Sequence, residues 1–102
     1  MINQKAIIMD IAMNLNRIGN WAADGFTPRS KKINMFLDQT SKNLESLDDS
    51  NSNLVLNGTL QKFKLEYKKL ALEARSKPPD EMLWAEKMMT WGNILTHRAK
   101  LL

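Results

Sequence analysis

Apolar residues recur at spacings of three and four positions in four separate segments of the chain. This spacing places them on one face of an α-helix, and it differs from the alternation typical of a β-strand. The segments carry their apolar residues from Ile7 to Ala22, from Ile33 to Leu47, from Leu56 to Ala74 and from Trp84 to Leu102. The pattern therefore predicts an all-α protein with four helices.

Residues typical of helix ends lie between these segments. Gly25 stands where a glycine is expected to end the first helix, and Thr27 followed by Pro28 is a favourable start for the second. The polar run 48–53 is the expected linker before the third helix. The proline pair at 78–79 is expected to end the third helix and to begin the fourth, because the residue before a proline avoids helical geometry.

Connections this short join antiparallel neighbours, so residues 1–102 are expected to form one domain, an up-down-up-down four-helix bundle. Helical hairpins that complete a bundle by dimerising are the alternative architecture. The pair Asn57-Gly58 introduces a local ambiguity, since it favours a tight hairpin turn in the stretch LVLNGTLQ. A lone hairpin is only marginally stable, so we expect the third helix to begin or fray near Asn57 instead.

One face of each predicted helix carries the candidate core. The predicted core residues include Ile11, Leu37, Leu44, Phe63, Tyr67, Trp84 and Trp91. On the last helix a column of small residues, Ala85, Gly92 and Ala99, runs beside the column with the two tryptophans. Small residues allow a neighbouring helix to come close, and large ones fill the space beside it. These tryptophans are therefore interpreted as packing residues and not as a ligand site.

Composition and motifs argue against catalysis and against a bound cofactor or metal. The chain has 102 residues, 43% hydrophobic and 25% charged, and no cysteine, so disulfides, thiolate metal sites and cysteine nucleophiles are excluded. The single histidine, His97, has no good metal ligand three or four positions away, and a haem held between Met9 and His97 is disfavoured because both project away from the predicted core. No acid–base pair, activated nucleophile or phosphate-binding loop is recognisable.

The expected location is the cytoplasm, without a membrane span. The amino-terminal stretch is amphipathic and is interrupted by Asp10 and Asn14, unlike the apolar region of a signal peptide. No apolar run approaches the ~20 residues that a membrane-spanning helix needs.

Charge is distributed unevenly along the chain. The net charge is +4, and all of the excess lies in residues 51–77, where six basic residues accompany only Glu66 and Glu73. Three of the six have no acidic residue one helical turn away and form a basic strip on the third helix. They are Lys64, Lys68 and Arg75.

This basic strip has apolar neighbours at Leu65 and Leu72, outside the predicted core face. A basic strip of this kind can bind nucleic acid or an acidic protein surface. The alternative is that its charges pair with acids of a neighbouring helix, such as Asp38 or Glu45.

The first and last helices carry more apolar residues than one helix face can bury. Those that project off the predicted core are Met9, Met13, Met82, Met89, Leu83 and Ile94. The first and last helices are neighbours in an up-down bundle, so these residues are expected to form one outer patch. Methionine-rich surfaces adapt to partners and large apolar patches mark interfaces, which predicts a partner interface there. The alternative is a wide core face with scattered apolar residues on the surface.

A line of polar residues on the first helix, Asp10, Asn14 and Arg17, leads to Trp21 and is interpreted as a buried or interfacial network. Together these features predict a small non-enzymatic helical module for protein–protein interaction. Its partner is expected to be a second copy, in a homodimer, or another protein. The alternative is a nucleic-acid-associated accessory protein that uses the basic strip.

Overall fold

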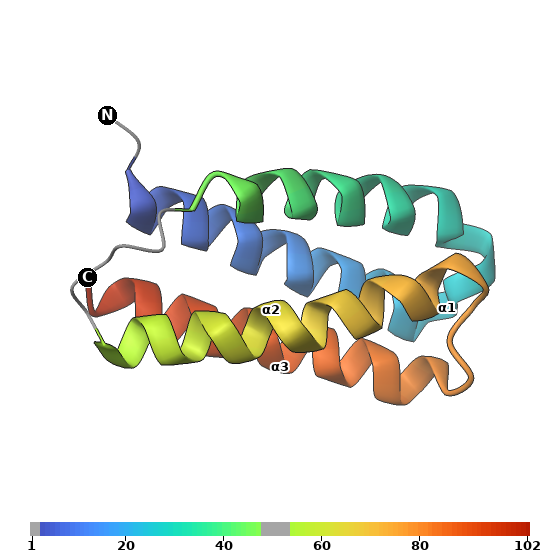
Figure 1. Ribbon diagram of the computed structural model, residues 1–102. Coiled ribbons are helices and arrows are strands. Elements are labelled where there is room, and N and C mark those ends of the chain that lie inside the picture. Colours follow the sequence, from blue (N-terminus) through green and yellow to red (C-terminus); the bar gives the residue numbers. More distant parts are fainter. Residues whose placement is uncertain (1–2, 48–53) are drawn as a thin grey trace.

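The computed structural model describes residues 3–47 and 54–102, and all regular secondary structure in them is helical (Figure 1). The helices are α1 (Gln4–Glu45), α2 (Leu54–Arg75) and α3 (Glu81–Lys100). The all-α prediction is confirmed, but the described chain has three helices where four were predicted. The run 48–53, predicted to be a linker, lies outside the described residues.

The count differs because α1 continues through the predicted boundary, with a break at Gly25. The backbone there has φ 148° and ψ 105°, a conformation that residues with a side chain rarely adopt and that glycine tolerates. The chain reverses its direction at this point, so the parts of α1 before and after Gly25 lie side by side (Figure 1, blue and green ribbons). Residues 4–24 are called the first arm below, and residues 26–45 the second arm.

The remaining helix ends agree with most of the local signals. The helix α2 begins at Leu54 and continues through Asn57-Gly58, so the hairpin alternative is wrong. It ends at Arg75, before the proline pair. The helix α3 is capped by Asp80, whose side chain accepts a hydrogen bond from the backbone N–H of Leu83 at 3.0 Å. The prolines thus separate the two helices, but Asp80 and not Pro79 provides the start of α3.

The first arm of α1 and α3 approach each other closely at two glycines. A Cβ atom on Gly19 would lie 3.0 Å from the carbonyl oxygen of Ala85 and would overlap the side chain of Met89. A Cβ atom on Gly92 would lie 2.8 Å from the side chain of Asn16. The close approach predicted for the small residues of the last helix is therefore present, and the first arm contributes a glycine of its own.

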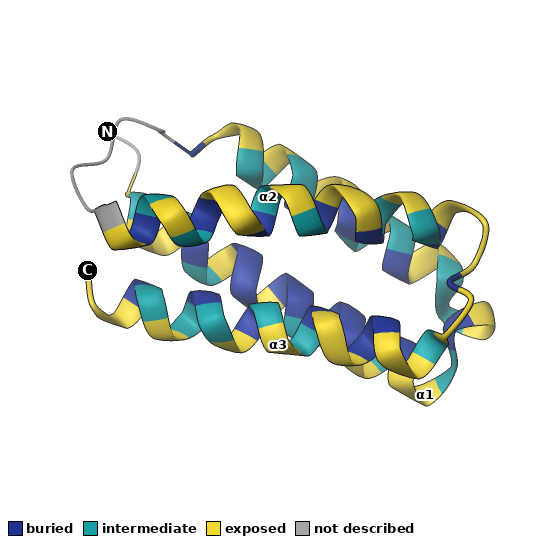
Figure 2. Cartoon of the chain, turned by 60° about the horizontal axis from the view of Figure 1, so that its bottom comes forward, coloured by how far each residue is buried: buried dark blue, intermediate teal, exposed yellow. Residues whose placement is uncertain are grey.

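Larger side chains fill the space between α2 and the other helices. Trp84 of α3 is 2% exposed, its ring meets that of Phe26 edge to face at 5.3 Å between centroids, and its Nε1 donates to the carbonyl oxygen of Leu70 at 2.9 Å. The ring of Phe63 in α2 lies 5.4 Å from that of Trp91, between centroids. These contacts join α1, α2 and α3 around one core, whose buried residues face inward in Figure 2.

Five of the seven residues predicted for the core are buried. They are Ile11, Leu37, Phe63, Tyr67 and Trp84. The other two, Leu44 and Trp91, are half-buried and pack against the edge of the core, so the two tryptophans of the last helix are not equivalent.

Candidate functional site: a groove between α1 and α2

The basic strip predicted from the sequence lies along α2. Lys68 and Arg75 are exposed, and Lys64 is half-buried. Within residues 3–47 and 54–102 neither Lys68 nor Arg75 forms an ion pair. The alternative in which acids of a neighbouring helix neutralise the strip is therefore not found for these two cations.

Lys68 and Arg75 border a groove of about 280 Å³ between α2 and the second arm of α1. The groove is lined by Ser41, Leu44, Tyr67, Lys68, Ala71, Leu72 and Arg75. Most of the lining residues are apolar, and the charges stand on the α2 side. A concave apolar surface with charges at its edge suits a protein segment better than a small polar molecule.

Tyr67 anchors the floor of this groove. Its side chain is 4% exposed, and its hydroxyl donates a hydrogen bond to the carbonyl oxygen of Leu37 at 2.6 Å. The same hydroxyl lies 3.3 Å from the hydroxyl oxygen of Ser41. Burial raises the pKa of Tyr67 to about 12, and the charge of Asp38 adds to this rise, while the hydrogen bond with Ser41 opposes it. The neutral hydroxyl thus holds α2 against the second arm.

We expect the stability of the protein to fall as the pH rises from about 10 to about 12. Tyr67 ionises near pH 10 in the unfolded chain but only near pH 12 in the folded one, so its contribution is complete below pH 10 and is lost between these values. A difference of about two units corresponds to roughly 3 kcal/mol. Urea unfolding at successive pH values measures the fall, which should be reduced in Tyr67→Phe.

The titration can be followed directly, because Tyr67 is the only tyrosine of the chain. The ultraviolet absorbance of tyrosinate therefore reports this side chain alone. Ionisation of the folded protein at the ordinary pKa of tyrosine would contradict the burial of the hydroxyl.

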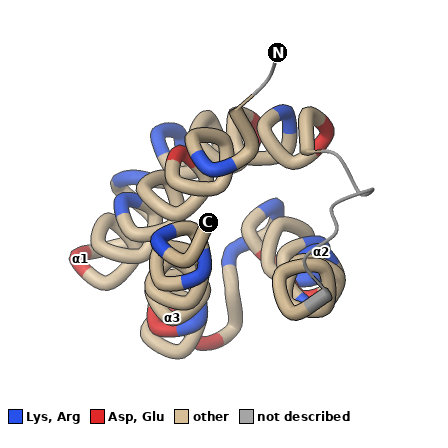
Figure 3. Tube along the Cα trace, turned by 90° about the vertical axis from the view of Figure 1, so that its left-hand side faces the viewer, with Lys and Arg blue, Asp and Glu red and all other residues tan. Residues whose placement is uncertain are grey.

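The opposite bank of the groove, on the second arm, carries acidic residues. Asp38 and Glu45 are exposed and lie one helical turn before and after Ser41, which lines the groove. Neither forms an ion pair within the part of the chain that the structure describes. The second arm thus brings two acids without an ion pair in the described chain, and the exposed Lys42 one helical turn from each, beside a groove whose α2 side is basic; Figure 3 marks the acidic and basic positions along the chain.

A second groove, also of about 280 Å³, lies between the two arms of α1. It is lined by Asp10, Met13, Asn14, Arg17, Gln39 and Asn43. The polar line predicted on the first helix forms one wall of it. Asn14 is 5% exposed and donates from its Nδ2 to the Oε1 of Gln39 at 3.3 Å, so the line takes part in a network between the arms.

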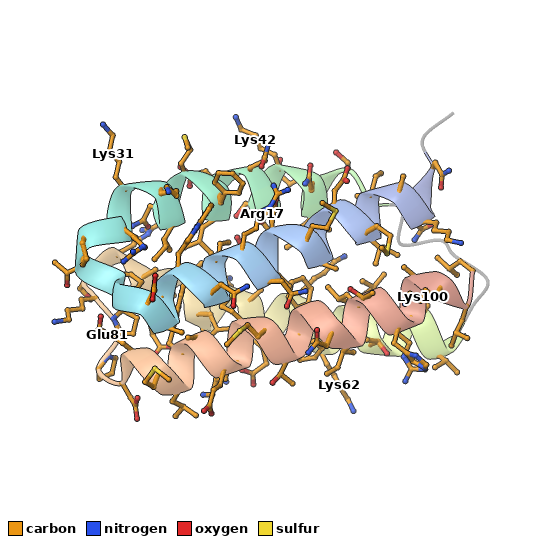
Figure 4. All side chains as sticks on the ribbon, turned by 180° about the vertical axis from the view of Figure 1, so that it is seen from behind. Arg17, Lys31, Lys42, Lys62, Glu81 and Lys100 are labelled. Atoms are coloured by element: carbon orange, nitrogen blue, oxygen red, sulfur yellow. The ribbon has the colours of Figure 1, made fainter. Side chains whose placement is uncertain are left out.

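Cations and aromatic rings continue this contact between the arms. The guanidinium of Arg17 lies 6.0 Å from the ring centroid of Phe36, and this ring meets Trp21 edge to face at 5.0 Å. The ammonium of Lys32 lies 4.8 Å from the ring centroid of Trp21. Figure 4 shows Arg17 between the two arms. Because the rings and cations already contact one another, this second groove is interpreted as a structural contact.

The second arm's share of this contact was not predicted from the sequence. The first arm places Asp10, Asn14, Arg17 and Trp21 at spacings of four, three and four, and the second arm places Lys32, Phe36, Gln39 and Asn43 at the same spacings. Two matching polar and aromatic lines on consecutive antiparallel helices are a signal that could have located the contact.

The six residues predicted as an outer partner interface differ in exposure. Met13 is 47% exposed, Met82 55% and Leu83 46%. The other three, Met9, Met89 and Ile94, are half-buried.

The structure also spreads these residues along the molecule. Gly19 faces Ala85 and Met89, so Met89 belongs to the contact between α1 and α3. The first arm of α1 and α3 run antiparallel. Met82 is therefore close to the level of Gly25 along the helix axes, and ~18 Å from the level of Met13, at 1.5 Å per residue. A partner interface on this side stays a prediction.

Comparison with known protein families, with curated proteins and with solved structures found no match. Within residues 3–47 and 54–102, no three His, Asp or Glu side chains are grouped so that they could hold a metal ion. None of the helices in this part of the chain combines the length and the apolar character that crossing a membrane requires.

Proposed function

We propose that this protein is a small non-enzymatic module that binds a helix of another protein chain in the groove between α1 and α2. The observation that carries the proposal is the apolar lining of this groove beside two cations that have no ion pair in the described chain. Binding a partner would cover the apolar surface and would supply the missing counter-charges.

A helix is the segment best suited to this groove. The groove runs between two antiparallel helices, a setting that receives apolar side chains spaced at i, i+3, i+4 and i+7 along a third helix. Leu65 and Leu72 extend the apolar surface along α2, since they are 69% and 53% exposed. An isolated exposed leucine needs no explanation, but two beside an apolar groove favour an interface.

The proposal includes a finer description of the architecture and of the location. The break at Gly25 supports counting the two arms of α1 as separate rods, which with α2 and α3 would make an up-down-up-down bundle of four. A cytoplasmic location is supported by the absence of cysteine, since reducing compartments do not favour disulfides.

Nucleic-acid association through the basic strip has less support. Proteins that bind single strands combine cations with exposed aromatic rings on which bases stack. The aromatic residue beside Lys68 is Tyr67, which is buried and hydrogen-bonded to Leu37. The groove therefore offers an apolar surface where a nucleic-acid site would need an accessible ring.

Selection from a displayed library of helical peptides tests the proposal. We expect enriched peptides to be amphipathic and to perturb the amide NMR signals of Leu44, Ala71 and Leu72. Leu72→Glu should weaken their binding ten- to a hundredfold, because burying one leucine contributes about 1.5–3 kcal/mol. Met35→Glu is the matched control, since Met35 is 60% exposed on the second arm and does not line the groove.

The proposal is overturned if no peptide is enriched. It is also overturned if the enriched peptides perturb other surfaces, or if Met35→Glu weakens binding as much as Leu72→Glu does.

A further inference from the structure

We infer that the partner of the face that carries this groove is a second copy of the same chain, which binds face to face so that the twofold axis runs parallel to the groove and the second arm of each copy lies over α2 of the other. The inference rests on the proposed function, because it names the partner of the same surface. Three features of the structure lead to it: the charges of the two banks, their positions along the groove, and the exposed leucines of α2.

Two complementary charges stand on opposite banks of the groove, and the chain itself does not pair them. Asp38 is exposed on the bank formed by the second arm, and Lys68 is exposed on the bank formed by α2. Neither forms an ion pair among the described residues. A partner that brought a basic residue to Asp38 and an acidic residue to Lys68 would satisfy both, and a second copy of this face carries both residues.

The positions along the groove allow this pairing. The hydroxyl of Tyr67 contacts Leu37 and Ser41, so the chain near Tyr67 lies level with residues 37–41 of the second arm. Lys68 is therefore close to the level of Asp38. A twofold axis parallel to the groove exchanges the banks but keeps the levels, so Asp38 of each copy faces Lys68 of the other.

A twofold axis across the groove gives the opposite result. It would place the second arm over the second arm of the other copy and α2 over α2, so Asp38 of one copy would not face Lys68 of the other. The pairing of these two residues therefore selects the parallel axis.

The same arrangement covers the exposed leucines. Leu65 and Leu72 stand beside Lys68 on α2, and the second arm of the other copy would lie over them. The molecule measures 40 by 22 by 20 Å, so one long face has room for the ~800 Å² per partner that a standard interface buries.

Charge exchange between copies tests the inference. We expect wild type to be dimeric at micromolar concentrations by size-exclusion chromatography with light scattering. Lys68→Glu and Asp38→Lys should each raise the dissociation constant of the dimer at least tenfold, because each substitution creates two like-charge contacts per dimer. An equimolar mixture of the two variants should recover the dimer, since every contact in the heterodimer then joins opposite charges.

Three controls keep the outcome clear. Asp38 and Lys68 are both exposed, so circular dichroism should show unchanged helical content in the variants. Met13→Glu should leave the dimer intact, because Met13 lies in the groove between the arms of α1. Dissociation by Met13→Glu but not by Lys68→Glu would place the interface on the other face and overturn the inference.

A monomeric wild type at high micromolar concentration, or a mixture that stays monomeric, also overturns the inference. Neither result bears on peptide binding in the groove, which the displayed library measures separately. Failure of the dimer and failure of the proposed function are thus distinguishable.

Discussion

Replacing Trp84 with alanine is expected to lower the free energy of unfolding by about 3–5 kcal/mol, the range for truncating a large buried aromatic residue. Trp84 is 2% exposed and contacts elements on both sides of the core, through the ring of Phe26 in α1 and the carbonyl oxygen of Leu70 in α2. The variant loses buried area, an edge-to-face contact and a hydrogen bond together. Urea unfolding followed by circular dichroism measures the change.

Trp91→Ala is the matched comparison. Trp91 is half-buried and lies at the edge of the core against Phe63, so its truncation should cost about 1–2 kcal/mol, since less area is lost. Equal losses in the two variants would contradict the difference in burial between these tryptophans. Domains have only about 5–15 kcal/mol of stability, so Trp84→Ala is expected to leave a marginally folded protein.

The same substitution at two helical glycines is expected to have opposite effects. Gly19→Ala should destabilise the protein by about 1–3 kcal/mol, because the new Cβ atom would meet the backbone oxygen of Ala85 at 3.0 Å and the side chain of Met89. Gly58→Ala should stabilise it by about 0.5–1 kcal/mol, because a Cβ atom there has open space and alanine favours the helix.

The two glycine variants therefore differ by about 1.5–4 kcal/mol, or roughly 6–30 °C in Tm for a domain of this size. The double variant Gly19→Ala, Met89→Ala should recover part of the loss, because it removes one of the two obstructions. If Gly19→Ala were as stable as wild type, α1 and α3 would not approach as closely as the structure shows.

Local sequence was sufficient to predict most helix limits, and the exceptions have identifiable causes. Gly25 was recognised as a turning point because its lack of a side chain permits a positive φ. It marks the break inside α1 at which the chain reverses its direction. Asn57-Gly58 was ambiguous because its turn preference is local, whereas Leu56 and Leu60 are buried on the core face of α2 and favour a helix through the pair.

The candidate site was predictable only in part. The sequence singled out Lys68 and Arg75 because no acid lies one turn away on their own helix. It left open whether another helix neutralised them, since that depends on which side of the second arm faces α2. The lining of the groove, including Ser41 and Ala71, was not predicted because it combines residues of two helices whose relative position no local pattern reports.

The sequence by itself therefore determined the helical class, the inward face of each helix and the charge of α2, because each depends on spacing within a single helix. Only the tertiary structure decided which helices come close and which leave a groove. Glycine at positions 19 and 92 brings α1 and α3 together, while the larger side chains of Phe63 and Trp84 pack between α2 and α3. The distance between two helices is set by side chains from both, so the groove between α1 and α2 exists only once the helices have packed.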